Sequence, residues 1–171
     1  MPNDIVVDTN VLLHAEDTRS VRCEHSLAFL RSLLLTDTQL CIDEGFSLSS
    51  SENTSHIASE YLEHLAFGAY GLYVVAELAR NLRVNEVRKS APYEKSRRIN
   101  QLIRKPKDRV FLSVAYNSHS KVLVSNDFED FQAAKRVTIR KELGVGVIDA
   151  QEASDAYATT EEVRLDTAGA E

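Results

Sequence analysis

The sequence predicts an α/β protein, built as a three-layer α/β/α sandwich around a central, mostly parallel sheet of four to five strands. Two observations predict this fold class. Short apolar runs that suit buried strands alternate along the chain with longer segments whose apolar residues recur at helical spacing. The short runs are also apolar throughout, as is typical of parallel strands that are covered on both faces.

Four apolar runs are expected to form strands. The first covers residues 4–8 and consists of Ile5-Val6-Val7 followed by Asp8. The others cover residues 39–42, 121–124 and 145–149. The carboxyl ends of such strands meet at one edge of a parallel sheet, and ligands bind at that edge in open α/β folds. Polar residues at the strand ends are therefore the first place to look for a functional site.

Helices are expected between these strands. In residues 20–35, for example, Leu27, Leu30, Leu33 and Leu34 recur at helical spacing. Gly144 is a plausible end for a helix because glycine adopts the left-handed cap conformation readily. The serine-rich stretch 43–55 is interpreted as a loop, and Asp43 and Glu44 as loop charges. The predicted helices cover residues 9–16, 20–35, 54–66, 69–84, 94–104, 107–117, 128–143 and 150–157, with a further loop at 86–93.

Length and composition predict one folded domain, with a short extension. The chain has 171 residues, of which 43% are hydrophobic, enough to bury a core. We place the domain at 1–150 and an acidic extension at 151–171, partly helical and then frayed from about Thr159. No run reaches the roughly 20 apolar residues that span a bilayer. With no secretory signal, and with Cys23 and Cys41 interpreted as reduced core thiols, a cytoplasmic location is expected.

Charge is distributed unevenly along the chain. The net charge is -6, which by itself argues against a nucleic-acid partner. Residues 80–109, however, carry eleven Lys and Arg but three Asp and Glu, a net of +8, whereas the rest carries 9 basic and 23 acidic residues, a net of -14. Such asymmetry indicates a polyanion partner, although a solvated pair of surface helices would also produce it.

Four acidic residues stand at corresponding places along the chain. Asp8 and Asp127 each follow an apolar strand, Glu60 lies in a predicted helix, and Asp108 lies in the first turn of another. Each residue alone has an ordinary interpretation, since Asp caps helices and turns, the helix dipole favours an acid in a first turn, and a helical Glu usually faces solvent. Their joint occurrence favours a shared site, because acids gathered without a cation would repel one another.

These residues, as Asp8-Thr9-Asn10, Glu60, Asp108 and Ser125-Asn126-Asp127, resemble the PIN-domain nucleases. In that family an acid ends the first strand, a Glu lies on a mid-chain helix, an Asp opens a later helix, and a Thr/Ser-x-Asp follows the next strand. The resemblance covers about residues 4–150. Small stand-alone members include the VapC-like toxins of toxin–antitoxin pairs, which this chain matches in size but not in its serine-rich stretch and acidic tail.

The resemblance implies a metal-dependent ribonuclease. Asp8, Glu60, Asp108 and Asp127 would hold one or two Mg²⁺ or Mn²⁺ ions, which prefer carboxylate oxygens and activate water for attack on phosphorus. Two further side chains, Asn10 and Ser125, would orient a ligand, or would act only as a helix cap and a turn residue. A nearby carboxylate, Asp130, would add another acid or cap the helix that follows it.

The expected partners follow from the same interpretation. RNA would be the substrate, with an antitoxin or other inhibitor protein and a homodimer expected by analogy. The alternative is a non-catalytic PIN-fold module that binds RNA or scaffolds a complex. The basic side chains expected to guide the RNA strand are Arg97, Arg98, Arg104, Lys105 and Lys107.

Other hydrolase classes fit the sequence less well. A haloacid-dehalogenase phosphatase needs a second Asp two residues after the first, where this chain has Asn10. No Gly-x-x-x-x-Gly-Lys-Ser/Thr loop is present for a nucleoside triphosphatase, and no Gly-x-Ser-x-Gly elbow for a serine hydrolase.

Overall fold

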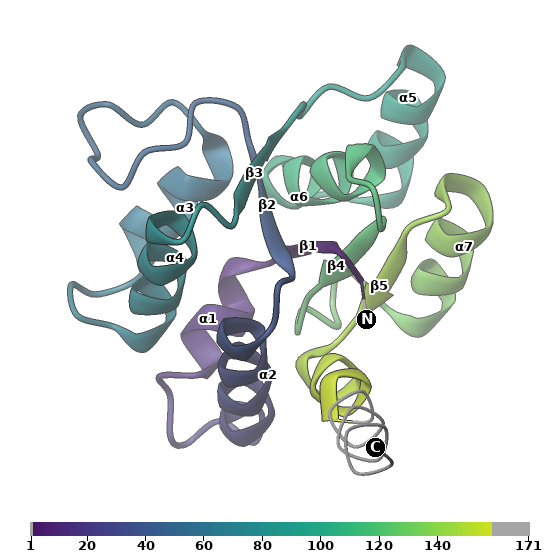
Figure 1. The fold of residues 1–171 in the computed structure, drawn as a ribbon. Coiled ribbons are helices and arrows are strands. Elements are labelled where there is room, and N and C mark those ends of the chain that lie inside the picture. Colours follow the sequence, from purple (N-terminus) through teal and green to yellow (C-terminus); the bar gives the residue numbers. More distant parts are fainter. Residues whose placement is uncertain (1, 159–171) are drawn as a thin grey trace, which may run out of the picture.

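Five parallel strands form the central sheet, in the order β3-β2-β1-β4-β5 (Figure 1). The computed structural model describes residues 2–158, so the predicted frayed end from Thr159 lies outside the described residues. The observed sheet confirms the predicted α/β/α class. The strands are β1 (Asp4–Val7), β2 (Gln39–Asp43), β3 (Val84–Val87), β4 (Val122–Val124) and β5 (Gly146–Ile148).

Helices cover both faces of this sheet and supply the outer two layers (Figure 1). One layer contains α1 (Thr9–His14), α2 (Cys23–Leu35), α3 (His56–His64) and α4 (Tyr70–Arg80), and the other contains α5 (Tyr93–Leu102), α6 (Pro106–Asn117) and α7 (Ala133–Leu143). Residues 150–158 are also helical and pack beside α2, where the rings of Phe29 and Tyr157 lie 5.9 Å apart. Among the described helices, none has the length and apolar character that crossing a bilayer requires.

The core lies on both sides of β1, the middle strand. Ile5, Val6 and Val7 are each at most 1% exposed, as expected for a strand covered by helices on both faces. From α6, Phe111 and Leu112 pack into the same cluster. Because β1 and α6 are fixed by this packing, the residues at the end of β1 and the start of α6 are held in place by the core.

One strand was missed by the sequence prediction. Residues 84–87 were assigned to the end of a helix and the start of a loop, but Val84–Val87 form β3 at the edge of the sheet, paired with β2. This strand has four residues, two of them polar, and none of its side chains is fully buried. The backbone turns into it at Leu82, which has a left-handed φ of 55°. An exposed edge strand of this kind lacks the apolar run that marked the others.

The predicted end of α7 agrees with the structure, but its predicted start does not. The helix ends at Gly144 in the predicted left-handed conformation, with φ of 72°. Its start lies at Ala133 rather than at residue 128, because residues 127–130 form a turn around the Asp127 side chain. The turn matters for the site described below.

Asp43 is a buried structural residue rather than a loop charge. Its side chain is fully buried and accepts hydrogen bonds from the Ser55 hydroxyl and from the backbone N–H groups of His56 and Ile57. The Lys89 ammonium lies 3.3 Å from it. Asp43 therefore fixes the first turn of α3 to the end of β2. Burial opposes ionisation of Asp43, but these hydrogen bonds outweigh it and lower the pKa of Asp43 below its ordinary value.

Replacing Asp43 by Ala is expected to lower the free energy of unfolding by about 2–4 kcal/mol at pH 7, because several buried donors lose their acceptor. Since the folded-state pKa is lowered, the stabilisation is present above the unfolded pKa near 4 and is lost as the pH falls through the folded value. Urea denaturation at pH 7 and at pH 3 measures both effects. Asp37→Ala, at an exposed position, is the control. Equal stability of the two variants at pH 7 would refute the assignment.

Candidate metal centre

The carboxyl ends of β1 and β4 lie side by side and carry the predicted acids. Val7 pairs with Val124, and the Asp8 N–H then donates to the Val124 carbonyl at 2.9 Å, so the ladder continues one residue past β1. This pairing places Asp8 next to Ser125, the first residue after β4. The Tyr61 hydroxyl of α3 donates to the Val7 carbonyl from the other side.

Asp8 is held by the two side chains predicted to orient it. Its Oδ2 accepts hydrogen bonds from Asn10 Nδ2 and from the Ser125 hydroxyl, both at 2.7 Å. Although Asp8 is the residue before α1, its side chain makes no capping hydrogen bond to that helix. The side-chain Oδ1 of Asn10 accepts a hydrogen bond from the Asn126 backbone N–H at 2.9 Å and so ties α1 to the same loop. Asp8 thus occupies the N-cap position of α1, but its carboxylate is engaged mainly by the side chains of Asn10 and Ser125.

The loop after β4 brings in two more acids. Asp127 Oδ1 accepts from the N–H groups of Glu129 and Asp130, each at 2.9 Å, which closes a tight turn. The Asp127 N–H donates to the Ser125 hydroxyl at 3.1 Å. The turn directs the Asp130 side chain inward, where it is 7% exposed.

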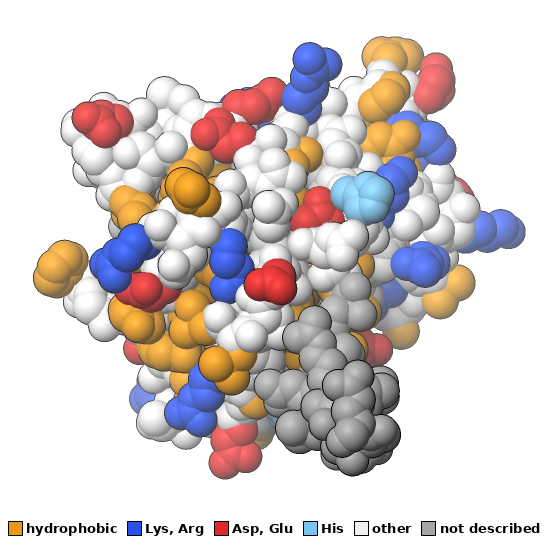
Figure 2. Space-filling view, in the orientation of Figure 1, with side chains coloured by type: hydrophobic (Ala, Val, Ile, Leu, Met, Phe, Trp, Pro, Cys, Tyr) orange, Lys and Arg blue, Asp and Glu red, His pale blue; other side chains and the backbone are white. Residues whose placement is uncertain are grey.

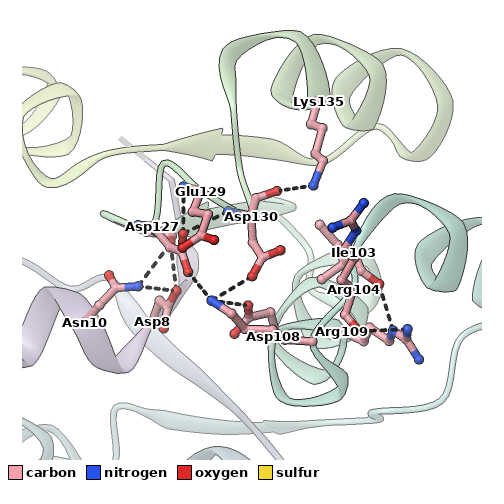
Figure 3. Close-up of polar contacts among 12 residues, drawn as sticks. Asp8, Asn10, Ile103, Arg104, Asp108, Arg109, Asp127, Glu129, Asp130 and Lys135 are labelled. Atoms are coloured by element: carbon pink, nitrogen blue, oxygen red, sulfur yellow. Dashed lines mark hydrogen bonds and ion pairs between the residues drawn. The ribbon is translucent and has the colours of Figure 1, made fainter.

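Asp108 completes the cluster from the first turn of α6 (Figure 3). One carboxylate oxygen each from Asp108, Asp127 and Asp130 lies within 4.8 Å of the other two. The Oδ2 atom of Asp108 is buried and has no hydrogen-bond partner among the described residues. A buried carboxylate oxygen without a donor is costly, so this atom is available to a cation.

Lys105 supplies positive charge to this cluster. Its ammonium lies 2.8 Å from Asp130 Oδ2, 3.1 Å from Asp127 Oδ2 and 3.9 Å from Asp108 Oδ2. Hydrogen bonds to Asp130 and Asp127 raise the pKa of Lys105 above its ordinary value, so the ammonium stays charged at neutral pH. Lys105 therefore lies where a bound cation would be expected, and half of its side chain remains exposed.

The carboxylates differ in their acidity. Burial raises the pKa of Asp8 to about 6, even though the hydrogen bonds from Ser125 and Asn10 act in the opposite direction. Burial, together with a hydrogen bond to Asp130 and the charge of Asp8, raises the pKa of Asp108 to about 7. For Asp127, burial is outweighed by the N–H donors of its turn and by Lys105, and its pKa is lowered. The cluster therefore binds a proton readily at neutral pH when no further cation is present.

Glu60, the fourth predicted acid, belongs to a different group. It lies on α3 beside Glu63 and His64, where its Oε1 is 2.6 Å from the Lys107 ammonium and its Oε2 is 3.3 Å from His64 Nε2. The structure thus brings together Asp108, Asp127 and Asp130, with Asp8 near enough to interact by charge with Asp108 and Asp127. Glu60 stands in a separate group and is linked to the cluster through its ion pair with Lys107, which precedes Asp108 in the chain.

Most of the predicted RNA-guiding side chains already have acidic partners. Lys105 lies in the aspartate cluster, Lys107 contacts Glu60, and the Arg98 guanidinium is paired with Glu142 of α7. Arg97 and Arg104 make no side-chain hydrogen bond or ion pair with any residue that the structure describes. The remaining basic residues of the segment include Arg83, which donates to backbone carbonyls at the end of α2.

Two features of the site were underestimated from the sequence. Asp130 was ranked below Asp127, yet it is the more buried of the two. Its position three residues after Asp127, within a turn closed by that residue, is the signal that could have found it. No sequence pattern indicates that Lys105 lies within the cluster, because its position depends on how α6 packs against β4.

Comparisons with protein-family models, with curated proteins and with solved structures find no match to this chain.

Asp108→Asn is expected to stabilise the metal-free protein. Because folding raises the pKa of the Asp108 carboxyl group, its ionisation lowers the free energy of unfolding. This loss begins as the pH exceeds the unfolded pKa near 4 and is complete above the folded pKa of about 7. In EDTA at pH 8 the variant should gain on the order of 1 kcal/mol in the free energy of unfolding, and the gain should shrink toward pH 4. Urea denaturation measures it, with Asp37→Asn as the control. A variant less stable than the wild type at pH 8 would contradict the electrostatic assignment.

Proposed function

We propose that this protein is a metal-dependent endoribonuclease that hydrolyses phosphodiester bonds in RNA, as its resemblance to PIN-domain nucleases implies. The observation that carries the proposal is the cluster of Asp108, Asp127 and Asp130 at the carboxyl edge of a parallel sheet, with Asp8 near enough to interact by charge with Asp108 and Asp127. They come from three separate parts of the chain. Gathering these carboxylates costs folding free energy unless positive charge balances them.

The residues present fit one or two Mg²⁺ or Mn²⁺ ions. The donors are carboxylate oxygens, which both ions prefer over nitrogen or sulfur. Asp108 Oδ2 is buried without a hydrogen-bond donor, and the oxygens of Asp108, Asp127 and Asp130 are close enough to share a cation. When bound, such an ion lowers the pKa of water and offsets charge on the phosphate.

The chain's own side chains have separable tasks in this reaction. Ser125 and Asn10 hold the Asp8 carboxylate in one orientation. The Asp127 turn aims Asp130 into the cluster. Glu60, which pairs with Lys107, lies in a separate group with Glu63 and His64, and these three side chains would hold a second ion.

Cleavage of a labelled single-stranded RNA tests the proposal. Purified protein with Mn²⁺ should cut the RNA, and EDTA should abolish cutting. Asp8→Asn should reduce the rate by more than about 100-fold, since even side chains that only orient metal ligands typically account for 10- to 100-fold. Ser125→Ala should fall within that smaller range.

Asp37→Asn, prepared in the same way, is the control and should cut as the wild type does. Equal cutting by Asp8→Asn would point to a contaminant or a different site and would refute the assignment. Circular dichroism of each variant separates loss of activity from loss of fold.

One observation favours the alternative function, a non-catalytic RNA-binding or scaffold module. The Lys105 ammonium already supplies the cluster with positive charge, so the acids do not need a metal to coexist. On this alternative Lys105 is a permanent partner of the acids. On the ribonuclease proposal, a metal displaces the Lys105 ammonium, which can move into solvent because half of the side chain is exposed.

Lys105→Met separates the two functions. If a metal displaces the ammonium, the variant should bind Mn²⁺ about 10-fold more tightly, equivalent to about 1.4 kcal/mol, and should be less stable than the wild type in EDTA. Isothermal titration calorimetry measures the affinity, and Lys141→Met, an exposed change on α7, is the control. Absence of Mn²⁺ binding in both wild type and Lys105→Met would favour the non-catalytic module.

Three further assignments remain predictions that rest on the family resemblance or on composition. They are a homodimer, inhibition by an antitoxin or similar protein, and a cytoplasmic location. Light scattering of the purified protein measures the first directly.

A further inference from the structure

One face of α5 presents a stripe of polar and aromatic side chains. Tyr93, Ser96, Arg97, Asn100 and Gln101 recur at positions i, i+3, i+4, i+7 and i+8, so they lie along the same side of the helix. Arg104, three residues beyond Gln101, continues the stripe past the end of the helix. We call these six residues the α5 track. The opposite side of the segment is buried through Ile99 and Ile103.

The α5 track is hollowed into two adjoining cavities. One, of about 380 Å³, is lined by the five helical residues of the track. The other, of about 430 Å³, shares Gln101 with the first and is lined by two basic side chains, Arg104 and Lys135, and by two acidic ones, Glu129 and Asp130. Figure 3 shows the side chains of Arg104 and Lys135 next to Asp130. The track therefore ends at the aspartate cluster.

Within the track, Gln101 accepts a hydrogen bond from Arg98 at 3.1 Å, but most of the other side chains have no polar partner among the described residues. Within residues 2–158, no hydrogen bond or ion pair engages the side chains of Tyr93, Arg97, Asn100 or Arg104. By contrast, Lys95 and Arg98 point to α7, where both head groups bind Glu142. The helix thus divides its cations between a structural side and an open side. Figure 2 shows Lys and Arg side chains gathered over α5 and α7.

Tyr93 lies at the far end of the track with 78% of its surface exposed. A tyrosine ring in this position makes no packing contribution to the core, and it offers a flat face on which a base can stack. Positive groups along a groove together with an exposed aromatic ring are the features that bind single-stranded nucleic acid.

We infer that the α5 track binds a single-stranded segment of RNA that flanks the bond to be cut. Arg97 and Arg104 contact phosphates, the Asn100 amide reaches base edges, and Tyr93 stacks on the outermost base. A ten-residue helix is about 15 Å long and matches about four stacked nucleotides at 3.4 Å each. The identity of the ligand as a substrate rests on the proposed ribonuclease function, while the binding surface stands on the track itself.

Binding can be measured apart from cleavage. Fluorescence anisotropy in EDTA, with labelled single-stranded RNAs of two to ten nucleotides, reports affinity without turnover. Affinity should rise with length up to about four to six nucleotides and then level off. Tyr93→Ala should weaken binding by about 5- to 150-fold, whereas Tyr93→Phe should retain it because the ring is kept. Arg97→Ala should reduce the slope of log affinity against log salt by about 0.7.

Matched controls lie elsewhere on the surface. Tyr73→Ala removes another exposed ring, on α4, and Arg31→Ala removes another exposed guanidinium, on α2. Both should bind as the wild type does. Wild-type affinity in Tyr93→Ala and Arg97→Ala, no binding of any oligonucleotide, or tighter binding of duplex RNA or of DNA with the same sequence would each overturn the inference.

The binding proposal and the cleavage proposal can be refuted independently of each other. RNA binding that depends on Tyr93 and Arg97, in a protein that cuts no RNA with Mn²⁺, would support the track and refute the nuclease. Cutting that depends on Asp8 but is unchanged by both track variants, together with unchanged binding, would support the nuclease and refute the track.

Discussion

The parallel pairing of β1 with β4 is the constraint on which the candidate site depends. The ladder runs through Val7 and Val124 and continues with the Asp8 N–H, so two segments far apart in sequence end at the same level. Side chains alternate along a strand, and a slip of one residue would turn Ser125 away from Asp8. The paired residues Val6 and Leu123, and Val7 and Val124, are each at most 1% exposed, so this part of the ladder is fixed within the core. Core packing and site geometry are therefore set by the same residues, and α6 adds Asp108 only because Phe111 and Leu112 anchor it to that core.

The features that could be predicted from the sequence are the buried ones, because burial requires runs of apolar residues that can be recognised there. Apolar runs identified β1, β2, β4 and β5, and the acids that follow β1 and β4 indicated where a site would lie. Edge strand β3 escaped prediction because a half-exposed strand needs no apolar run. The roles of Asp43 and Asp130 could not be predicted because each depends on the geometry of a turn. Asp43 accepts backbone N–H groups at the start of α3, and Asp130 is positioned by its N–H donating to the Asp127 carboxylate. The sequence alone does not give the positions of these N–H groups.

Counting charges along the sequence locates a basic segment but does not identify which of its charges are accessible on the surface. The basic stretch 80–109 looks uniform in the sequence, yet the fold assigns its members to different tasks. Arg83 holds carbonyls at the end of α2, Lys89 pairs with Asp43, and Arg98 joins α5 to α7. A count of basic residues therefore overstates the surface that a polyanion meets. What remains accessible is decided by helix phase, since residues three and four apart on α5 share a face while their neighbours are turned toward α7.

The position of Lys105 also bears on how the protein matures. In many small metalloproteins the ligands repel one another until the ion arrives, so metal binding and folding are a single event. Here an ammonium from the chain itself lies among Asp108, Asp127 and Asp130. A newly made chain can therefore complete its fold with an internal counter-ion, and on the proposed function it would acquire a metal afterwards. Assembly would then be insensitive to the local supply of divalent ions, and only the activity would follow that supply.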